Sequence, residues 1–259
     1  MTEKSEIHNK EIKEQFAKQA KAYTALSAHT QDLIRLFNMA EPTVTDRVLD
    51  VACGSGIVGL AFAAYVEGVT GIDLTPEMLD EAKRLQKSKG LNNVEFIQGD
   101  VNSLPFEDDT FEIVISRFSF HHLNIPKKVL SEMVRVCKPG GLILVADVAL
   151  PDEKKDRYNE MELLRDSSHV SALSVNEHRE LFVSSGLITI QHDNYYMEIE
   201  LEDQLKASFC DKEKLRRMII EDVGIDTLGI KATQFDDSLK MYYPIHIFAG
   251  RKPEGSLIN

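Results

Sequence analysis

The chain has 259 residues, enough to bury a substantial core, and we expect one domain with a cap rather than two independent domains. Its 30 Lys and Arg against 42 Asp and Glu give a formal net charge of −12, which argues against nucleic acid as a substrate because phosphate binding depends on clustered cations. The N-terminus is polar and the sequence has no long apolar run, so we expect a cytoplasmic protein without a membrane span. The three cysteines form no CxxC pair, which predicts reduced, buried thiols and no metal site.

The N-terminal region predicts a helix ahead of a sheet, because Ile12, Phe16, Ala20 and Tyr23 recur at helical spacing. From residue 47 onward, apolar runs alternate with helical patterns, which predicts a parallel sheet with helices on both faces. The expected strands are 47–52, 69–73, 94–98, 111–116 and 141–147, and the expected helices are 57–65, 76–89 and 126–137. Thr75-Pro76-Glu77 supplies an N-cap, a first-turn proline and a first-turn acid for the second helix.

The pattern loosens after residue 150. The expected elements there are a charged segment at 152–165, a helix near 176–185, a strand near 187–199, a charged helical stretch at 201–221 and a closing strand at 241–249. We therefore expect a helical cap at 1–45, a cofactor-binding core at 46–150, and a C-terminal half at 151–259 whose insertion at about 200–235 serves as a lid.

The strand at 47–52 runs directly into a glycine turn and then a helix, which is typical of a nucleotide-cofactor site. Gly54 and Gly56 let the backbone turn tightly and approach a ligand, whereas Gly59 lies inside the helix, where we expect alanine to be tolerated better. The spacing Gly54-x-Gly56-x-x-Gly59 also satisfies the dinucleotide fingerprint of a dehydrogenase. The turn alone therefore leaves two classes of cofactor open.

An acid stands at the end of each of three successive strands: Asp50, Asp73 and Asp100. The carboxyl ends of parallel strands meet at one crevice, so all three carboxylates should face the same ligand. Such a crevice suits a cationic cofactor that carries an ammonium for Asp50, a ribose diol for Asp73 and an exocyclic amine for Asp100, and S-adenosylmethionine is that molecule. The alternatives are a turn-capping role for Asp50 and a helix-approach role for Asp73.

Five segments in this order resemble the motifs of class I S-adenosylmethionine-dependent methyltransferases, close to the ubiquinone/menaquinone-biosynthesis (methyltransferase type 11) group. They are 48–56, 71–79, 99–106, 116–123 and 138–141, within a resemblance that runs from about Phe16 to Arg251. The resemblance implies an α/β fold with a doubly wound, mostly parallel, seven-stranded Rossmann-like sheet whose last strand is antiparallel. It implies cofactor contacts from Tyr23, Asp50, Ala52, Gly54, Gly56, Asp73, Leu74, Met78, Asp100, Val101 and Ser116.

Within that set, Leu74 and Met78 would sandwich the adenine, and the alternative for Met78 is plain helix core. The backbone of Val101 would join Asp100 in reading the adenine edge. Tyr23 would pack over the cofactor as part of the lid, where an aromatic face stabilises a sulfonium.

His121 and His122 follow the fourth expected strand and form a poor two-ligand metal site, because sequence neighbours point in different directions. One of them is a candidate general base near neutral pH; the alternative is that one stacks under the cofactor and the other packs in the turn. Arg117 is either an ion-pair partner for Asp147 or an anchor for an anionic substrate. Four aromatic residues are candidates for an aromatic acceptor pocket or for ordinary core: Phe118, Phe120, Tyr195 and Tyr196.

The sequence thus predicts an enzyme that methylates carbon or oxygen of a small-molecule acceptor by in-line transfer, in which the protein contributes mainly alignment. Two alternatives stay open. A nicotinamide-dependent oxidoreductase would explain the glycine spacing and Asp73, and a noncatalytic cofactor-binding or regulatory protein could keep the same fold.

Overall fold

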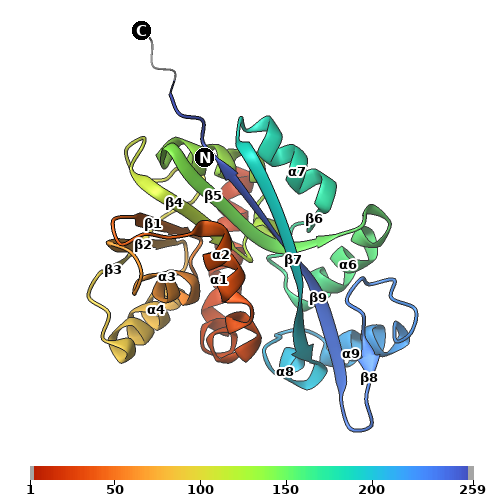
Figure 1. Cartoon of the computed structure of the whole chain (residues 1–259). Helices are drawn as coiled ribbons and strands as arrows, with labels where there is room; N and C mark the ends of the chain where they lie inside the picture. The colour runs from red at the N-terminus through yellow and green to blue at the C-terminus, as the bar shows by residue number, and fades with distance from the viewer. Residues whose placement is uncertain (1–2, 256–259) are drawn as a thin grey trace.

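One mixed sheet with helices on both faces organises the chain (Figure 1). The computed structural model describes residues 3–255. Its longer strands are β1 (Arg47–Val51), β2 (Gly68–Asp73), β3 (Val94–Gln98), β4 (Phe111–Arg117), β5 (Cys137–Leu150), β7 (Ile188–Glu200) and β9 (Leu239–Arg251). They follow the order β3-β2-β1-β4-β5-β9-β7, with β9 antiparallel to both of its neighbours. The predicted doubly wound, mostly parallel, seven-stranded sheet is confirmed, with two short extra strands, β6 (Leu173–Ser174) and β8 (Thr233–Gln234).

The strand order reverses between β1 and β4, which lie side by side in parallel. β2 and β3 continue the sheet to one side of β1, while β5 and β9 continue it beyond β4. In open sheets of this kind ligands bind at the carboxyl ends of the strands where the order reverses. The topology therefore places the end of β1, residues 51 and onward, at the expected binding crevice.

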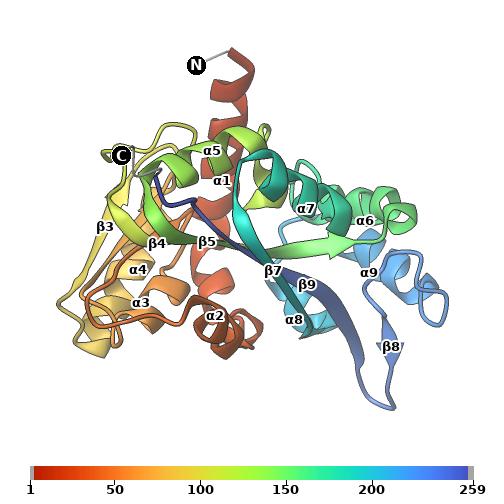
Figure 2. The same ribbon diagram turned by 45° about the horizontal axis from the view of Figure 1, so that its top comes forward.

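Helices cover both faces of the sheet (Figure 2). The helices are α1 (Glu3–Ala25), α2 (Leu33–Ala40), α3 (Ile57–Phe62), α4 (Pro76–Lys89), α5 (Pro126–Val136), α6 (Asp152–Arg165), α7 (Val175–Ser184), α8 (Leu201–Lys206) and α9 (Lys212–Glu221). Strand residues alternate between the two layers: Val48 and Ile113 pack in the cluster that includes α2 and α3, whereas Leu49 and Val114 pack with α5 and α7. Within residues 3–255, no helix combines the length and apolarity needed to cross a bilayer.

Several boundaries differ from the sequence predictions. The charged segment at 152–165 forms a helix, α6, which buries Tyr158, Met161 and Glu162 on one side. The helical stretch predicted at 201–221 is two helices, α8 and α9, separated by a turn. The ends of the predicted ranges 1–45 and 151–259, residues 1–2 and 256–259, lie outside the described residues.

Helix α4 begins at Pro76 as predicted, but its cap differs from the expected one. Thr75 occupies the N-cap position without a side-chain hydrogen bond to the helix. Instead, the Thr75 amide donates to Asp73 Oδ1 over 2.8 Å. The carboxylate at the end of β2 therefore fixes the entry of α4.

Candidate active site

The glycine turn connects the ends of β1 and β2 through hydrogen bonds that its backbone amides donate. The Gly54 amide donates to Asp73 Oδ2 over 2.8 Å, and the Cys53 amide donates to the Ile72 carbonyl over 3.0 Å. Gly54 has a φ of +53°, and a Cβ there would lie 2.9 Å from the Met78 Cε atom. A side chain at this position would fill the space in front of the turn, so glycine leaves the backbone open to a ligand.

Asp50 is buried at the end of β1, with 1% of its surface exposed. Its Oδ2 accepts the Gly59 amide of α3 over 2.9 Å, and burial raises the pKa of the carboxyl to about 7. A Cβ on Gly59 would lie 2.9 Å from Val69 Cγ1 and 3.2 Å from that carboxylate oxygen. An alanine at position 59 would therefore crowd the contact between α3 and the sheet, although it would not enter the cavity.

Asp73 and Asp100 complete the row of acids. Both oxygens of Asp73 accept backbone amides, and burial raises its pKa despite these hydrogen bonds. Asp100 Oδ1 accepts the Asn102 amide over 2.9 Å, and Oδ2 accepts the Asn9 side chain of α1 over 2.9 Å. Partial burial raises the pKa of Asp100, but the hydrogen bonds outweigh it and the net pKa is lowered.

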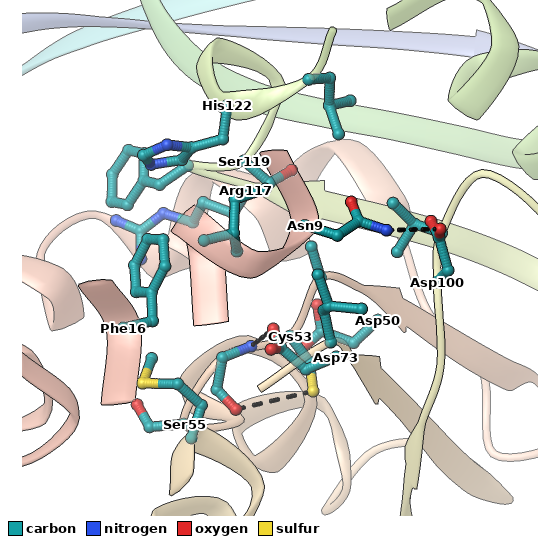
Figure 3. Close-up of a pocket in the computed structure, with 18 of the residues that line it drawn as sticks. Asn9, Phe16, Asp50, Cys53, Ser55, Asp73, Asp100, Arg117, Ser119 and His122 are labelled. Atoms are coloured by element: carbon teal, nitrogen blue, oxygen red, sulfur yellow. Dashed lines mark hydrogen bonds between the residues drawn. The ribbon is translucent and has the colours of Figure 1, made fainter. Parts of the chain in front are cut away.

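These acids share one cavity of about 1130 Å³, which we call the glycine-turn cavity. In Figure 3, Asp50 and Asp73 lie close together beside the glycine turn, while the Asn9 amide reaches Asp100 along another wall. The first helix covers this cavity with His8, Asn9, Ile12 and Phe16. Its walls include the predicted contacts Tyr23, Asp50, Ala52, Gly54, Asp73, Leu74, Met78, Asp100 and Val101.

Ser116 and Gly56, the other two predicted cofactor contacts, are not among the residues that line this cavity. Ser116 is fully buried, and its hydroxyl donates to the Val51 carbonyl over 2.8 Å, which ties β4 to β1. Gly56 caps α3, and a Cβ there would lie 2.7 Å from the Phe96 ring. Both residues therefore support the glycine turn through contacts on the side away from the cavity.

His121 faces a second cavity of about 680 Å³, which we call the His121 cavity. Its Nδ1 lies 2.6 Å from Asp147 Oδ1, and the other Asp147 oxygen accepts the Phe120 amide over 2.7 Å. Among the described residues, His121 Nε2 has no hydrogen-bond partner. Burial lowers the pKa of His121, but the Asp147 carboxylate outweighs it and holds the net pKa above 6.5.

His122 has a different environment. Its Nδ1 lies 3.1 Å from the Ser168 carbonyl, and the residue lines both cavities. Burial, followed by the neighbouring His121, lowers its pKa to about 3, so the ring is neutral near pH 7. Of the two histidines, only His121 has a carboxylate on one nitrogen and an open second nitrogen. The expectation that sequence neighbours point apart is only partly met, since the ring centroids lie 4.1 Å apart.

Arg117 is not an ion-pair partner of Asp147, which corrects one alternative from the sequence. Its guanidinium donates to the carbonyls of His29 and Gln31 and, over 2.9 Å, to the Tyr195 hydroxyl. These bonds tie the turn after α1 to β4 and β7.

The four aromatic candidates lie in different environments. Phe118 lines both cavities, whereas Phe120 is buried in the core. Tyr195 and Tyr196 line neither cavity, and the Lys231 ammonium lies 3.9 Å from the centroid of the exposed Tyr196 ring. Only Phe118 therefore stays a candidate for contact with a ligand.

The cysteines are free, but the prediction of burial holds fully only for Cys137. Cys53 and Cys210 are partly exposed, and Cys53 lines the glycine-turn cavity, where burial raises the pKa of its thiol. Within residues 3–255, no group of three or more His, Cys, Asp or Glu side chains is arranged to hold a metal ion.

The sequence reasoning missed two sets of cavity residues. Asn9 and Phe16 on α1 reach the cavities across a long sequence separation, and only the helical spacing of Phe16 gave a signal. Glu162 and Arg165 lie in the charged segment 152–165, to which the sequence reasoning assigned no functional role.

Comparisons with known proteins agree with one another. A family model described as a methyltransferase domain matches residues 48–141. An uncharacterized methyltransferase of Bacillus subtilis, YcgJ, is 34% identical over 205 residues, which are 77% of this chain and 81% of that protein. A demethylmenaquinone methyltransferase of Clavibacter sepedonicus is 36% identical over 110 residues, which are 42% of this chain and 44% of that protein. The structure of a putative methyltransferase from Bacillus halodurans superposes with a TM-score of 0.78 and 29% identity, over 86% of this chain and 99% of that one.

Proposed function

Because the chain belongs to the class I S-adenosylmethionine-dependent methyltransferases, we propose that it binds S-adenosylmethionine in the glycine-turn cavity and methylates a carbon or oxygen atom of a small molecule. The observation that carries this proposal is the convergence of three strand-end acids on the glycine turn of one cavity. The similarity to a demethylmenaquinone methyltransferase supports a small-molecule acceptor.

The residues present fit the cofactor. Asp50 would hold the methionine ammonium, Asp73 the ribose diol and Asp100, with the Val101 backbone, the adenine edge. Each Asp73 oxygen already accepts one amide and keeps a second lone pair for a ribose hydroxyl. A Cβ at Gly54 would fill the space in front of the turn, so the cradle is shaped for a ligand that approaches the backbone.

When bound, S-adenosylmethionine supplies an electrophilic methyl carbon on sulfur. The protein's own part is alignment and proton handling. His121 Nε2 would take the proton of an acceptor hydroxyl, while Asp147 holds the ring in place through Nδ1. The Tyr23 phenol lines both cavities, and burial raises its pKa to about 12, so it stays neutral beside a positive charge.

The lid assignment and a cytoplasmic location remain predictions. Helix α1 lines both cavities through Phe16, which supports the N-terminal cap. In the segment 200–235, Gln204 and Ala207 line only the His121 cavity, which supports a lid over the acceptor side.

Calorimetry with S-adenosylmethionine and with a nicotinamide dinucleotide tests the cofactor. We expect saturable binding of the first and none of the second, because a pyrophosphate would face Asp50 and Asp73. Asp80→Asn on the exposed side of α4 is a matched control for changes at these acids. Transfer of labelled methyl groups to a panel of phenols and other small acceptors tests the alternative of a noncatalytic binding protein. Binding without transfer to any acceptor would favour that alternative.

A further inference from the structure

The two cavities adjoin each other, because five residues line both of them: Phe16, Tyr23, His29, Phe118 and His122. The glycine-turn cavity holds the row of acids, and the His121 cavity meets it at these five residues. On the proposed function, a molecule in the His121 cavity would therefore lie next to the methyl donor.

The buried carboxylate of Glu162 lines the His121 cavity, and only one of its two oxygens has a hydrogen-bond partner among the described residues. Glu162 is 1% exposed, and Arg165 donates to its Oε2 from both Nε and Nη2. Among the described residues, Glu162 Oε1 has no hydrogen-bond partner. A buried carboxylate oxygen without a donor is costly, so this atom favours a ligand that brings an O–H or N–H group.

The charges around the His121 cavity disfavour anionic ligands. Its walls carry three carboxylates, Asp147, Glu162 and Asp166, against one guanidinium, Arg165, and the imidazole of His121. Although burial raises the pKa of Asp166, the neighbouring His122 and Arg165 outweigh it and lower the pKa to about 2. With His121 protonated the balance is −1, and with His121 neutral it is −2. An anionic ligand would meet net repulsion in this partly desolvated space.

We propose that the His121 cavity is the acceptor site and that it selects an uncharged aromatic acceptor with two hydrogen-bond donors, one facing His121 Nε2 and one facing Glu162 Oε1. The proposal rests on the proposed methyl transfer. For an O-methylated acceptor, its hydroxyl proton passes to His121 Nε2, its oxygen forms the bond to the methyl carbon, and the electron pair of the carbon–sulfur bond stays on sulfur. The rings of Phe16 and Phe118 supply an aromatic wall.

Three matched probes test this selection in the wild-type protein: 4-methylcatechol with two donors, 4-methylphenol with one, and 3,4-dihydroxybenzoate with two donors and a negative charge. Each is titrated by calorimetry into protein saturated with S-adenosylhomocysteine. We expect 4-methylcatechol to bind about 10-fold more tightly than either of the other two, the scale of one hydrogen bond to a charged group. Equal or tighter binding of the benzoate, or no binding of 4-methylcatechol, would overturn the proposal.

Glu162→Gln tests the charge directly, with Glu160→Gln as control, since Glu160 is exposed on the same helix. In Glu162→Gln, the preference for 4-methylcatechol over 3,4-dihydroxybenzoate should shrink about 10-fold, and in the control it should not change. An unchanged preference in a folded Glu162→Gln protein would remove Glu162 from the site. Should that variant fail to fold, the wild-type probe series still decides.

A spectroscopic readout locates the bound probe. The NMR signal of His121 Cε1, assigned by its loss in His121→Gln, should move when 4-methylcatechol is added. A signal that stays fixed while the probe binds would place the probe elsewhere and overturn the proposal. Titration of S-adenosylhomocysteine alone distinguishes a failure of the proposed function from a failure of the acceptor-site proposal. If S-adenosylhomocysteine does not bind, the proposed function is refuted. If it binds but the protein does not respond to 4-methylcatechol, only the acceptor site is refuted.

Discussion

Replacing Asp50 by Asn should stabilise the cofactor-free protein above neutral pH. Burial raises the pKa of this carboxyl from 3.8 to about 7, so the folded state keeps a proton that the unfolded chain releases. The contribution of Asp50 to stability is therefore greatest below pH 3.8, falls as the pH rises towards 7 and is constant above it. Roughly three pKa units at about 1.4 kcal/mol each give a cost of about 4 kcal/mol at pH 8.

The Asn side chain removes that cost while it keeps an oxygen for the Gly59 amide, which lies 2.9 Å from the present carboxylate. The difference in unfolding free energy between Asp50→Asn and wild type should grow from about zero at pH 4 to as much as about 4 kcal/mol at pH 8. Urea unfolding at a series of pH values measures it, with Asp80→Asn as the surface control. The same variant should bind S-adenosylmethionine more weakly, because the ammonium loses its charged partner. Parallel pH profiles for the variant and wild type would refute the reasoning.

Three further predictions concern the turn and the histidine. Asp73→Ala should weaken S-adenosylmethionine binding by about 2 kcal/mol, measured by calorimetry, and lower the thermal midpoint, since this carboxylate also accepts the Gly54 amide; an unchanged Kd would remove Asp73 from the site. Gly54→Val should impair cofactor binding in a folded protein, whereas Gly59→Ala should chiefly lower the thermal midpoint, because its methyl group would lie 2.9 Å from the packed face of β2; equal losses of binding would mean that the turn is misplaced. Turnover should rise with pH through an apparent pKa above 6.5, and Asp147→Asn should lower that apparent pKa. His121→Gln should lower kcat about 100-fold while cofactor affinity is kept. Full activity of His121→Gln would exclude His121 as the base.

The sheet and the row of acids were predictable because their signals are local. Asp50 and Asp73 each stand at the end of an apolar run, and parallel strands bring such ends together whatever the rest of the chain does. The contact between Asn9 and Asp100 has no such signal, because 91 residues separate the two partners. Its existence depends on how α1 packs across the finished sheet.

One of the two alternatives for Arg117, an ion pair with Asp147, fails for a conformational reason. Phe118 has a φ of +56°, a left-handed conformation that is uncommon for a bulky residue. This backbone reversal turns the amides of Phe120 and His121 toward Asp147. Arg117, on the strand before it, instead donates to the His29 carbonyl in the turn after α1. An apolar pattern gives no warning of a single positive φ.

The position of β9 between β5 and β7 has a consequence for synthesis of the protein. Within the described sheet, β7 has no neighbour other than β9, so it cannot join the sheet until residues 239–251 have left the ribosome. Until then β5 and β7 both expose unpaired edges, which invite association with other chains. The same strand brings Tyr243 and Ile245 to the wall of the His121 cavity. The nascent chain can thus complete β1 to β4 early, whereas the wall of the His121 cavity is complete only after β9 has been added.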